Sequence, residues 1–245
     1  MKGADDLKIA HISDLHVTSP YFVKEYGETV IGRVNELSPD LLIITGDLTQ
    51  YGHLHEFEIA KEFVDRFEVE DKVIVMGNHD ARNLGYEIFE ELIGTRYPFH
   101  ETDEVAIFGI DSTVPDMDDG HVGREYYDII LERLKDRDKI RILALHHHLI
   151  PIPGTGRERH IPVDSGDVLK LIRELDIDLV LSGHKHLPWV WKFEDTHFVT
   201  AGTSCTRRLK GKSHPSFNII SIDEGHISIE EINVANDDRR EVLRT

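Results

Sequence analysis

Cysteine, basic residues and long apolar runs are scarce or absent in this chain of 245 residues. The single cysteine, Cys205, rules out a disulfide within the chain, and we expect a cytoplasmic protein. Because no apolar run reaches 18 residues, we expect no membrane-spanning helix. The 28 basic residues are far outnumbered by 46 acidic ones, which gives a formal net charge of −18. This charge disfavours attraction to a nucleic-acid backbone or an anionic membrane, so we expect neither a long nucleic acid nor a membrane as a partner.

Histidine, in contrast, is abundant. The chain has 16 histidines, and several of them directly follow apolar segments. The remaining composition, 40% hydrophobic and 30% charged, is typical of a globular protein, and the length suffices for a substantial core. We expect a single domain over residues 1–235 and a charged C-terminal tail over residues 236–245.

Apolar strand patterns alternate with helical patterns over the first three quarters of the chain. Such alternation predicts a parallel sheet with helices on its faces. Buried strands are expected at 7–12, 41–44, 73–76, 105–110, 140–145 and 179–181, and helices at 22–37, 54–67, 86–93, 126–135 and 164–175. We expect Asp164 to cap the last of these helices. Only short strands are expected after residue 186, and we expect them to form a second sheet packed on the first.

Residues that can bind a metal follow five of the predicted strands directly. Ligands of open α/β sheets bind beyond the carboxyl ends of the strands, so these residues are expected at one site. They are Asp14 and His16, Asp47, Asn78 and His79, His146, and His184 and His186. Because side chains alternate along extended backbone, each pair separated by one residue is expected to point to one side.

This mixture of imidazole and carboxylate donors suits zinc, iron, manganese or nickel. The number of donors exceeds the six or so that one ion uses, and so we expect two ions. Asp47 is the natural bridge between them, because a carboxylate offers two oxygens. Two ions about 3.5–4 Å apart generate a hydroxide at neutral pH and hold a phosphoryl group during in-line displacement.

Taken singly, these residues have simpler explanations. An aspartate or histidine after a strand is usually a cap or turn residue, and Gly46, Gly77 and Gly183 can be ordinary turn glycines. Their joint occurrence at five strand ends favours a functional site. We interpret the other histidines considered as structural or surface residues, namely His11, His100, His197, His214 and His226.

In this order along the chain, the motifs resemble those of the calcineurin-like metallophosphoesterases. The motifs are Asp14-x-His16, Gly46-Asp47, Gly77-Asn78-His79-Asp80, a strand-terminal His146 and Gly183-His184-x-His186, followed by Ala201-Gly202-Thr203. The resemblance runs from about residue 9 to residue 186. It implies a four-layer α/β/β/α sandwich of two mixed sheets flanked by helices, with a dinuclear metal centre. It also implies hydrolysis of phosphate esters by a hydroxide that bridges the two metals.

The resemblance further implies a role for each motif residue. One ion would be held by Asp14, His16, Asp47 and His186, and the other by Asp47, Asn78, His146 and His184. His79 would contact the substrate and protonate the leaving group, and Asp80 would orient His79.

The run of three histidines leaves one ligand open. His146 directly follows the predicted strand, but a strand longer by one residue would make His147 the ligand. We expect His148, Arg207 and Arg208 to contact the substrate. The cyclic-nucleotide phosphodiesterases of this family resemble the chain most closely at these histidines, although the Pro-Pro pair that follows in them is missing here.

The sequence is compatible with three classes of function. The favoured function is a phosphodiesterase for a small or nucleotide-like diester; the alternatives are a DNA or RNA nuclease of the same fold and a non-catalytic, metal-containing interaction module. The basic cluster at Arg207, Arg208, Lys210 and Lys212 is either a phosphate clamp or a solvated turn, and Arg157 and Arg159 form a second basic pair. The rings considered for stacking on a base are His121, Tyr126, Trp189 and Trp191. The sequence is compatible with a monomer and with a homo-oligomer.

Overall fold

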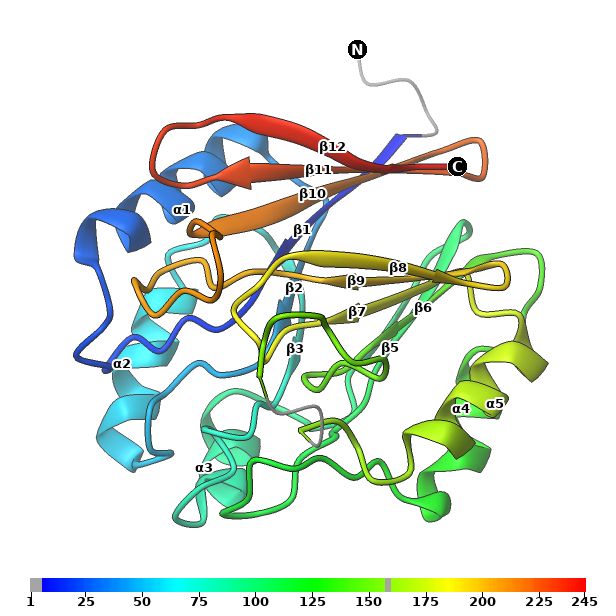
Figure 1. The fold of residues 1–245 in the computed structure, drawn as a ribbon, viewed down its shortest axis with the longest axis horizontal. Coiled ribbons are helices and arrows are strands. Elements are labelled where there is room, and N and C mark those ends of the chain that lie inside the picture. The colour runs from blue at the N-terminus through cyan, green and yellow to red at the C-terminus, as the bar shows by residue number, and fades with distance from the viewer. Residues whose placement is uncertain (1–5, 157–159) are drawn as a thin grey trace.

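A computed structural model describes residues 6–156 and 160–245 (Figure 1). Arg157 and Arg159 therefore lie outside the described residues. Two six-stranded sheets pack face to face, with helices on the outer face of each sheet. Among the described residues, no helix has the length and apolar character needed to cross a bilayer.

The first sheet has the strand order β12-β11-β10-β1-β2-β3. Its strands are β1 (Asp6–Ile12), β2 (Leu41–Thr45), β3 (Asp71–Val75), β10 (Ser216–Asp223), β11 (His226–Asn233) and β12 (Arg239–Arg244). The first three strands are parallel, and β10 pairs antiparallel with β1. Three helices cover this sheet: α1 (Lys24–Leu37), α2 (Leu54–Val64) and α3 (Gly85–Leu92).

The second sheet has the order β4-β5-β6-β7-β9-β8. Its strands are β4 (Phe99–Glu101), β5 (Val105–Gly109), β6 (Ile140–Ala144), β7 (Leu179–Ser182), β8 (Trp189–Phe193) and β9 (Thr196–Thr200). The four strands β5, β6, β7 and β9 are parallel, and β4 and β8 are antiparallel edges. A short 3-10 turn, η1 (Arg124–Tyr126), leads into α4 (Tyr127–Arg133), which covers this sheet together with α5 (Ser165–Leu175).

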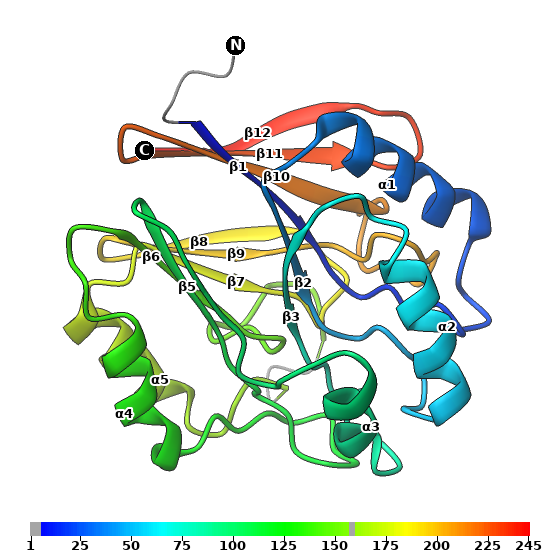
Figure 2. The same ribbon diagram turned by 180° about the vertical axis from the view of Figure 1, so that it is seen from behind.

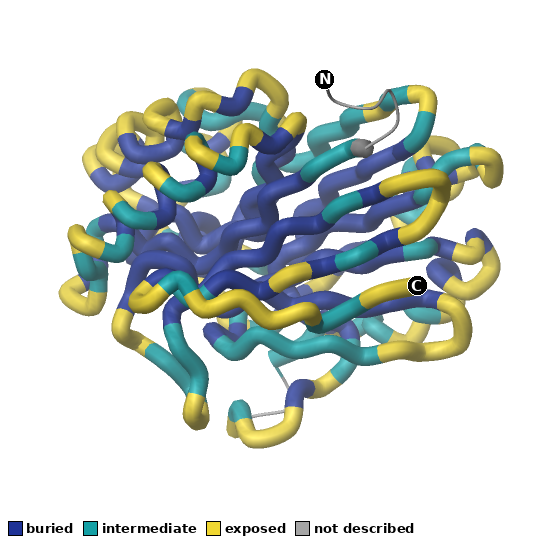
Figure 3. Tube along the Cα trace, turned by 90° about the horizontal axis from the view of Figure 1, so that it is seen from above, coloured by how far each residue is buried: buried dark blue, intermediate teal, exposed yellow. Residues whose placement is uncertain are grey.

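Three apolar cores separate the four layers. Ile43 and Val75 of the first sheet meet Ile107 and Ile142 of the second in the central core. The other two cores lie between each sheet and its helices, which occupy opposite sides of the molecule in Figure 2. Figure 3 shows the buried strands at the centre and the exposed loops around them. The predicted four-layer sandwich of two mixed sheets is therefore confirmed.

The arrangement of the C-terminal strands differs from our expectation. They do not form a sheet of their own, because β8 and β9 complete the sheet of β5–β7 and β10–β12 extend the sheet of β1–β3. Hydrophobic alternation shows which segments are strands but does not show which strands pair. A hairpin joins β10 to β11, with Asp223 opposite His226.

Two further expectations need correction. Most of the charged tail is the strand β12, which pairs with β11 and packs Val242 and Leu243 against the central core. Asp164 occupies the N-cap position of α5, but its side chain does not cap that helix. It accepts hydrogen bonds from the backbone N–H groups of Val122 and Gly123 instead, so it ties two loops together.

Candidate metal centre

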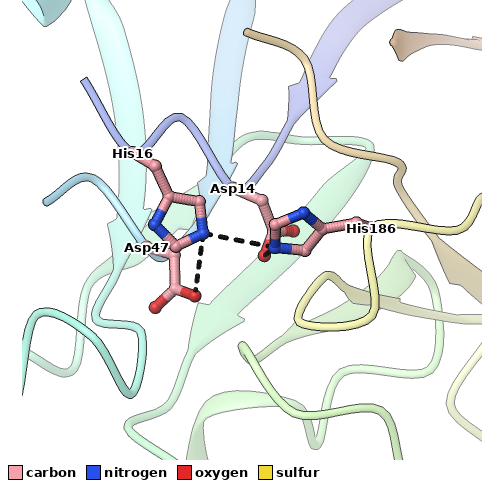
Figure 4. A group of neighbouring side chains, drawn as sticks. All are labelled: Asp14, His16, Asp47 and His186. Carbon is pink, nitrogen blue, oxygen red and sulfur yellow. Dashed lines mark hydrogen bonds and ion pairs between the residues drawn. The ribbon is translucent and has the colours of Figure 1, made fainter. Parts of the chain in front are cut away.

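Four predicted ligands that follow the ends of three strands, β1, β2 and β7, form a compact buried group. The ligand atoms of Asp14, His16, Asp47 and His186 all lie within 4.8 Å of one another (Figure 4). His16 and His186 approach through their Nε2 atoms at 3.2 Å, and His186 Nε2 lies 3.3 Å from Asp14 Oδ1. Ligands about 2.0–2.2 Å from one ion are about 2.8–3.6 Å apart, so these spacings fit a shared ion. Asp14 Oδ1 is buried without a hydrogen-bond partner, which also fits a cation.

The other predicted ligands form an adjoining group. The Oδ1 atom of Asn78 lies 3.0 Å from His146 Nε2 and 3.0 Å from His184 Nδ1. The two imidazole nitrogens are 3.3 Å apart. These distances lie in the same range, so the second group also fits an ion.

Asp47 lies between the two groups. Its Oδ2 atom is 3.4 Å from His16 Nε2 and 3.4 Å from His146 Nε2. Its Oδ1 atom accepts a hydrogen bond of 2.9 Å from the backbone N–H of His79. The sequence argument assigned one oxygen to each ion, but in the structure a single oxygen faces both groups and the other holds the His79 loop.

Backbone carbonyls fix the orientation of three of the imidazoles. The Nδ1 atoms of His16, His146 and His186 donate to the carbonyls of Thr49 (3.1 Å), Thr45 (2.7 Å) and Arg208 (2.7 Å). In its neutral form, each of these rings therefore presents an unprotonated Nε2, which is the atom that can bind a metal. His184 differs, because its Nδ1 faces the second group.

The backbone at these residues is not extended, contrary to our expectation. Asp14, His16, Asp47, His184 and His186 all have positive φ angles, between 44° and 73°. This left-handed conformation costs a non-glycine residue roughly 1–2 kcal/mol. The paired ligands thus converge through tight turns beyond the strand ends, and the strain is concentrated at the site.

Two of the motif glycines are required because the backbones approach closely. A Cβ atom at Gly77 would lie 2.1 Å from the backbone nitrogen of Asp47 and 2.2 Å from its Oδ1. A Cβ atom at Gly183 would lie 1.9 Å from the hydroxyl of Ser13 and 2.7 Å from Asp14 Oδ2. These glycines therefore do more than form turns, because a side chain there would displace a candidate ligand.

The groups are strongly coupled by charge. Burial opposes ionisation of Asp47, but the imidazoles of His146 and His79 outweigh it and hold the pKa of Asp47 well below its usual range. Burial likewise opposes protonation of His146, but Asp47 raises the pKa of His146 to about 9. Burial and the neighbouring histidines hold the pKa of His184 well below its usual value. The buried carboxylates thus attract positive charge into this site.

The three consecutive histidines point in different directions. His146 faces Asn78 and Asp47, whereas His147 forms a hydrogen bond of 2.9 Å through Nδ1 with the hydroxyl of Ser112. The geometry thus brings His146, and not His147, into the ligand group. His148 is 3% exposed and its ring stacks on that of His184, so it lies behind the site.

His79 and Asp80 have separate surroundings. The Nδ1 atom of His79 donates to the carbonyl of Gln50 at 2.8 Å. The carboxylate of Asp80 accepts from the backbone N–H groups of Leu48 (3.1 Å), Thr49 (2.8 Å) and Gly77 (2.9 Å). Asp80 therefore joins the loops that carry Asp47 and Asn78, and the contact that orients the His79 ring comes from Gln50.

The two groups open into a cavity of about 560 Å³. Its walls contain residues that the motifs did not identify, among them Gln50, Tyr51, Arg82, Asp118 and Lys185. Arg82 and Tyr51 each lie a few residues beyond a motif, and that proximity is the one signal that marks them in the sequence.

The predicted substrate contacts are only partly placed at this cavity. Arg208 and Lys210 line it, whereas Lys212 and Trp189 line a different cavity and Arg207 is exposed. The remaining candidates for base stacking are occupied elsewhere. Trp191 bonds the carbonyl of Pro151, Tyr126 stacks on Tyr97, and His121 lies 3.7 Å from Asp164.

Comparison with known proteins agrees with this geometry. Residues 7–188 match the family described as calcineurin-like phosphoesterase. A probable cyclic nucleotide phosphodiesterase of a Synechococcus species is 28% identical over 197 residues, which cover 75% of each chain. A protein of the same description from Rhodococcus erythropolis is 30% identical over 68% of this chain and 58% of its own.

A solved structure shows the same fold. Purple acid phosphatase PPD1 from yellow lupin seeds has a TM-score of 0.78 at 12% identity, over 98% of this chain and 53% of that chain. The chain thus spans little more than half of the Rhodococcus and lupin proteins. Because the family match covers most of its length, the chain belongs to the calcineurin-like phosphoesterases, which are metal-dependent hydrolases of phosphate esters.

Proposed function

We propose that the protein is a phosphodiesterase that hydrolyses small, nucleotide-like diesters at a dinuclear metal centre. The observation that carries the proposal is Asp47 Oδ2, which lies 3.4 Å from an imidazole nitrogen of each candidate ligand group. Manganese, iron, zinc or nickel ions held by the two groups would supply an activated water and neutralise charge on the phosphoryl oxygens. The ligand sets are Asp14, His16, Asp47 and His186 for one ion, and Asp47, Asn78, His146 and His184 for the other.

His79 would assist the leaving group. Its Nδ1–H is engaged by the Gln50 carbonyl, so Nε2 is the atom left to face a substrate in the cavity. A proton on Nε2 would be transferred to the departing alkoxide, a contribution that is typically worth 10²–10⁴ in rate. The Gln50 carbonyl would stabilise the protonated ring in that role.

Basic side chains would hold the substrate anion. Arg208 and Lys210 line the cavity, and neither forms an ion pair within the part of the chain that the structure describes. In a chain of net charge −18, cations left without a carboxylate partner at a cavity favour an anionic ligand. The cavity volume of about 560 Å³ is within the range for small-molecule sites, and two relatives are named probable cyclic nucleotide phosphodiesterases.

A substrate panel with metal reconstitution tests this function. We expect the manganese-loaded protein to hydrolyse 3′,5′-cyclic AMP and bis(p-nitrophenyl) phosphate faster than p-nitrophenyl phosphate or single-stranded DNA. A preference for single-stranded DNA would replace the proposal by a nuclease. Bound metal without hydrolysis of any of the four would indicate an interaction module.

Two variants separate metal binding from proton transfer. Asp47→Ala should lose both bound metal and activity, whereas His79→Ala should keep its metal and lose roughly 10²-fold or more in kcat. His100→Ala, on the edge strand β4, is the matched control and should behave like the wild type. Wild-type hydrolysis by both site variants would refute the mechanism.

A further inference from the structure

The cavity has one aromatic wall. Among the described residues, Tyr51 is the one tyrosine, phenylalanine or tryptophan that lines it. The residue is 50% exposed, so its ring is accessible to a ligand. The four rings considered from sequence for base stacking lie elsewhere, so Tyr51 is the large aromatic ring of this cavity that a flat group of a substrate can contact.

The backbone that carries this ring is held from both sides. Its N–H donates to Glu56 Oε2 at 2.8 Å, and its carbonyl accepts from Asn83 Nδ2 at 3.1 Å. Glu56 is only 2% exposed and also accepts from the backbone N–H of His53 at 3.1 Å. The ring therefore projects from a fixed segment, so the backbone does not have to be ordered when a ligand packs on the ring.

The ring lines the same cavity as His79, the group that would serve the leaving alcohol. Gln50, its neighbour in sequence, holds the His79 ring through its carbonyl. Arg208 also lines the cavity, and its carbonyl accepts from Nδ1 of His186. The cavity thus combines a cation, an aromatic surface and the candidate general acid.

We propose that Tyr51 determines specificity by stacking on the aromatic group of the substrate. The preferred substrates are then phosphodiesters that carry a nucleobase or a comparable flat ring. The inference rests on the proposed phosphodiesterase function and adds to it the residue that selects for the flat ring. Stacking of a base on an aromatic side chain is worth roughly a fivefold to hundredfold change in affinity.

Two cyclic diesters that differ only in the base test this role. They are 3′,5′-cyclic AMP and the 3′,5′-cyclic phosphate of methyl riboside. We expect the wild type to favour the adenosine ester in kcat/KM by roughly fivefold to hundredfold. Tyr51→Ala should lose this preference, because its KM should rise for cyclic AMP but not for the methyl riboside ester. Tyr51→Phe should retain the preference. An unchanged preference in Tyr51→Ala would overturn the inference.

A matched control and a binding measurement complete the test. Tyr21 is 48% exposed but does not line the cavity, so Tyr21→Ala should keep the preference for the base. Titration calorimetry of the metal-loaded protein with AMP and with ribose 5-phosphate measures stacking without turnover. If the wild type hydrolyses neither ester, the proposed function is wrong. If the wild type hydrolyses them but binds AMP and ribose 5-phosphate with equal affinity, stacking on Tyr51 is wrong.

Discussion

Asp118 accepts a hydrogen bond from the side-chain amide of Asn78, with 3.2 Å between Oδ1 and Nδ2 across 40 residues of sequence. An ionised carboxylate can only accept, so this contact requires the amide nitrogen on its own side and the amide oxygen on the other. That oxygen is the atom 3.0 Å from His146 Nε2 and from His184 Nδ1. Asp118 therefore determines that Asn78 presents oxygen, and not N–H, to the second ligand group.

Replacement of Asp118 by alanine should weaken binding of the second ion. Loss of a partner that orients a ligand typically reduces metal affinity 10–100-fold, and we expect a change of that order for one of two ions. Titration calorimetry of the metal-free protein with Mn²⁺ measures both sites. Asp119→Ala removes a neighbouring carboxylate that does not bond Asn78 and serves as the control. Equal affinities in the two variants would show that Asn78 needs no such partner.

Gly77→Ala should abolish the metal site. The added methyl would meet the backbone nitrogen of Asp47 at 2.1 Å, a separation that forces this loop apart. We expect the purified variant to bind less than half of the wild-type metal, as measured by elemental analysis. Gly166→Ala, within α5, is the matched change, because no atom lies within 4 Å of its added methyl. That variant should keep full metal content and gain roughly 0.5–1 kcal/mol in stability.

Asp80→Ala distinguishes two roles for this carboxylate. If Asp80 holds the loops through Leu48, Thr49 and Gly77, its loss leaves buried N–H donors unsatisfied at roughly 1–3 kcal/mol each. We then expect lower stability in urea and lower metal content together. A variant with wild-type stability and metal content but reduced turnover, like that expected for His79→Ala, would instead support the orienting role that the family resemblance implied.

The strand-end motifs located most of the candidate site because they are local in sequence. Asp14, Asp47 and Asn78 each follow an apolar strand, and parallel strands bring their carboxyl ends to one edge. The sequence did not show how the ligands converge. Alternation on extended backbone was the assumed reason, but left-handed turns at residues such as Asp14 and His186 achieve it instead. Positive φ at a non-glycine residue leaves no mark in hydrophobic periodicity.

Contacts between distant loops were beyond the sequence patterns. Asp118 reaches the cavity through loop geometry that no spacing encodes. Asp164 appeared to be a helix cap although it joins two loops. Likewise, β10 pairs with β1 although about two hundred residues separate the two strands in the sequence, and local patterns cannot specify such a pairing. The tail strand β12 was missed because its charged residues dominate its composition, while only Val242 and Leu243 face the core.

His11 lies outside the candidate ligand groups and should make stability depend on pH. It is fully buried, with Nε2 at 3.0 Å from the Thr45 hydroxyl, and burial lowers its pKa from 6.5 to about 3. Below pH 6.5 the unfolded chain binds a proton at His11 that the folded protein does not, so folding weakens as pH falls. Between pH 7.5 and pH 5 this contribution is about 2 kcal/mol. In urea titrations of the metal-free protein, His11→Gln should lose that much less stability than the wild type over this interval. Because the other buried histidines are common to both proteins, the same loss in both would show that His11 is protonated in the folded state.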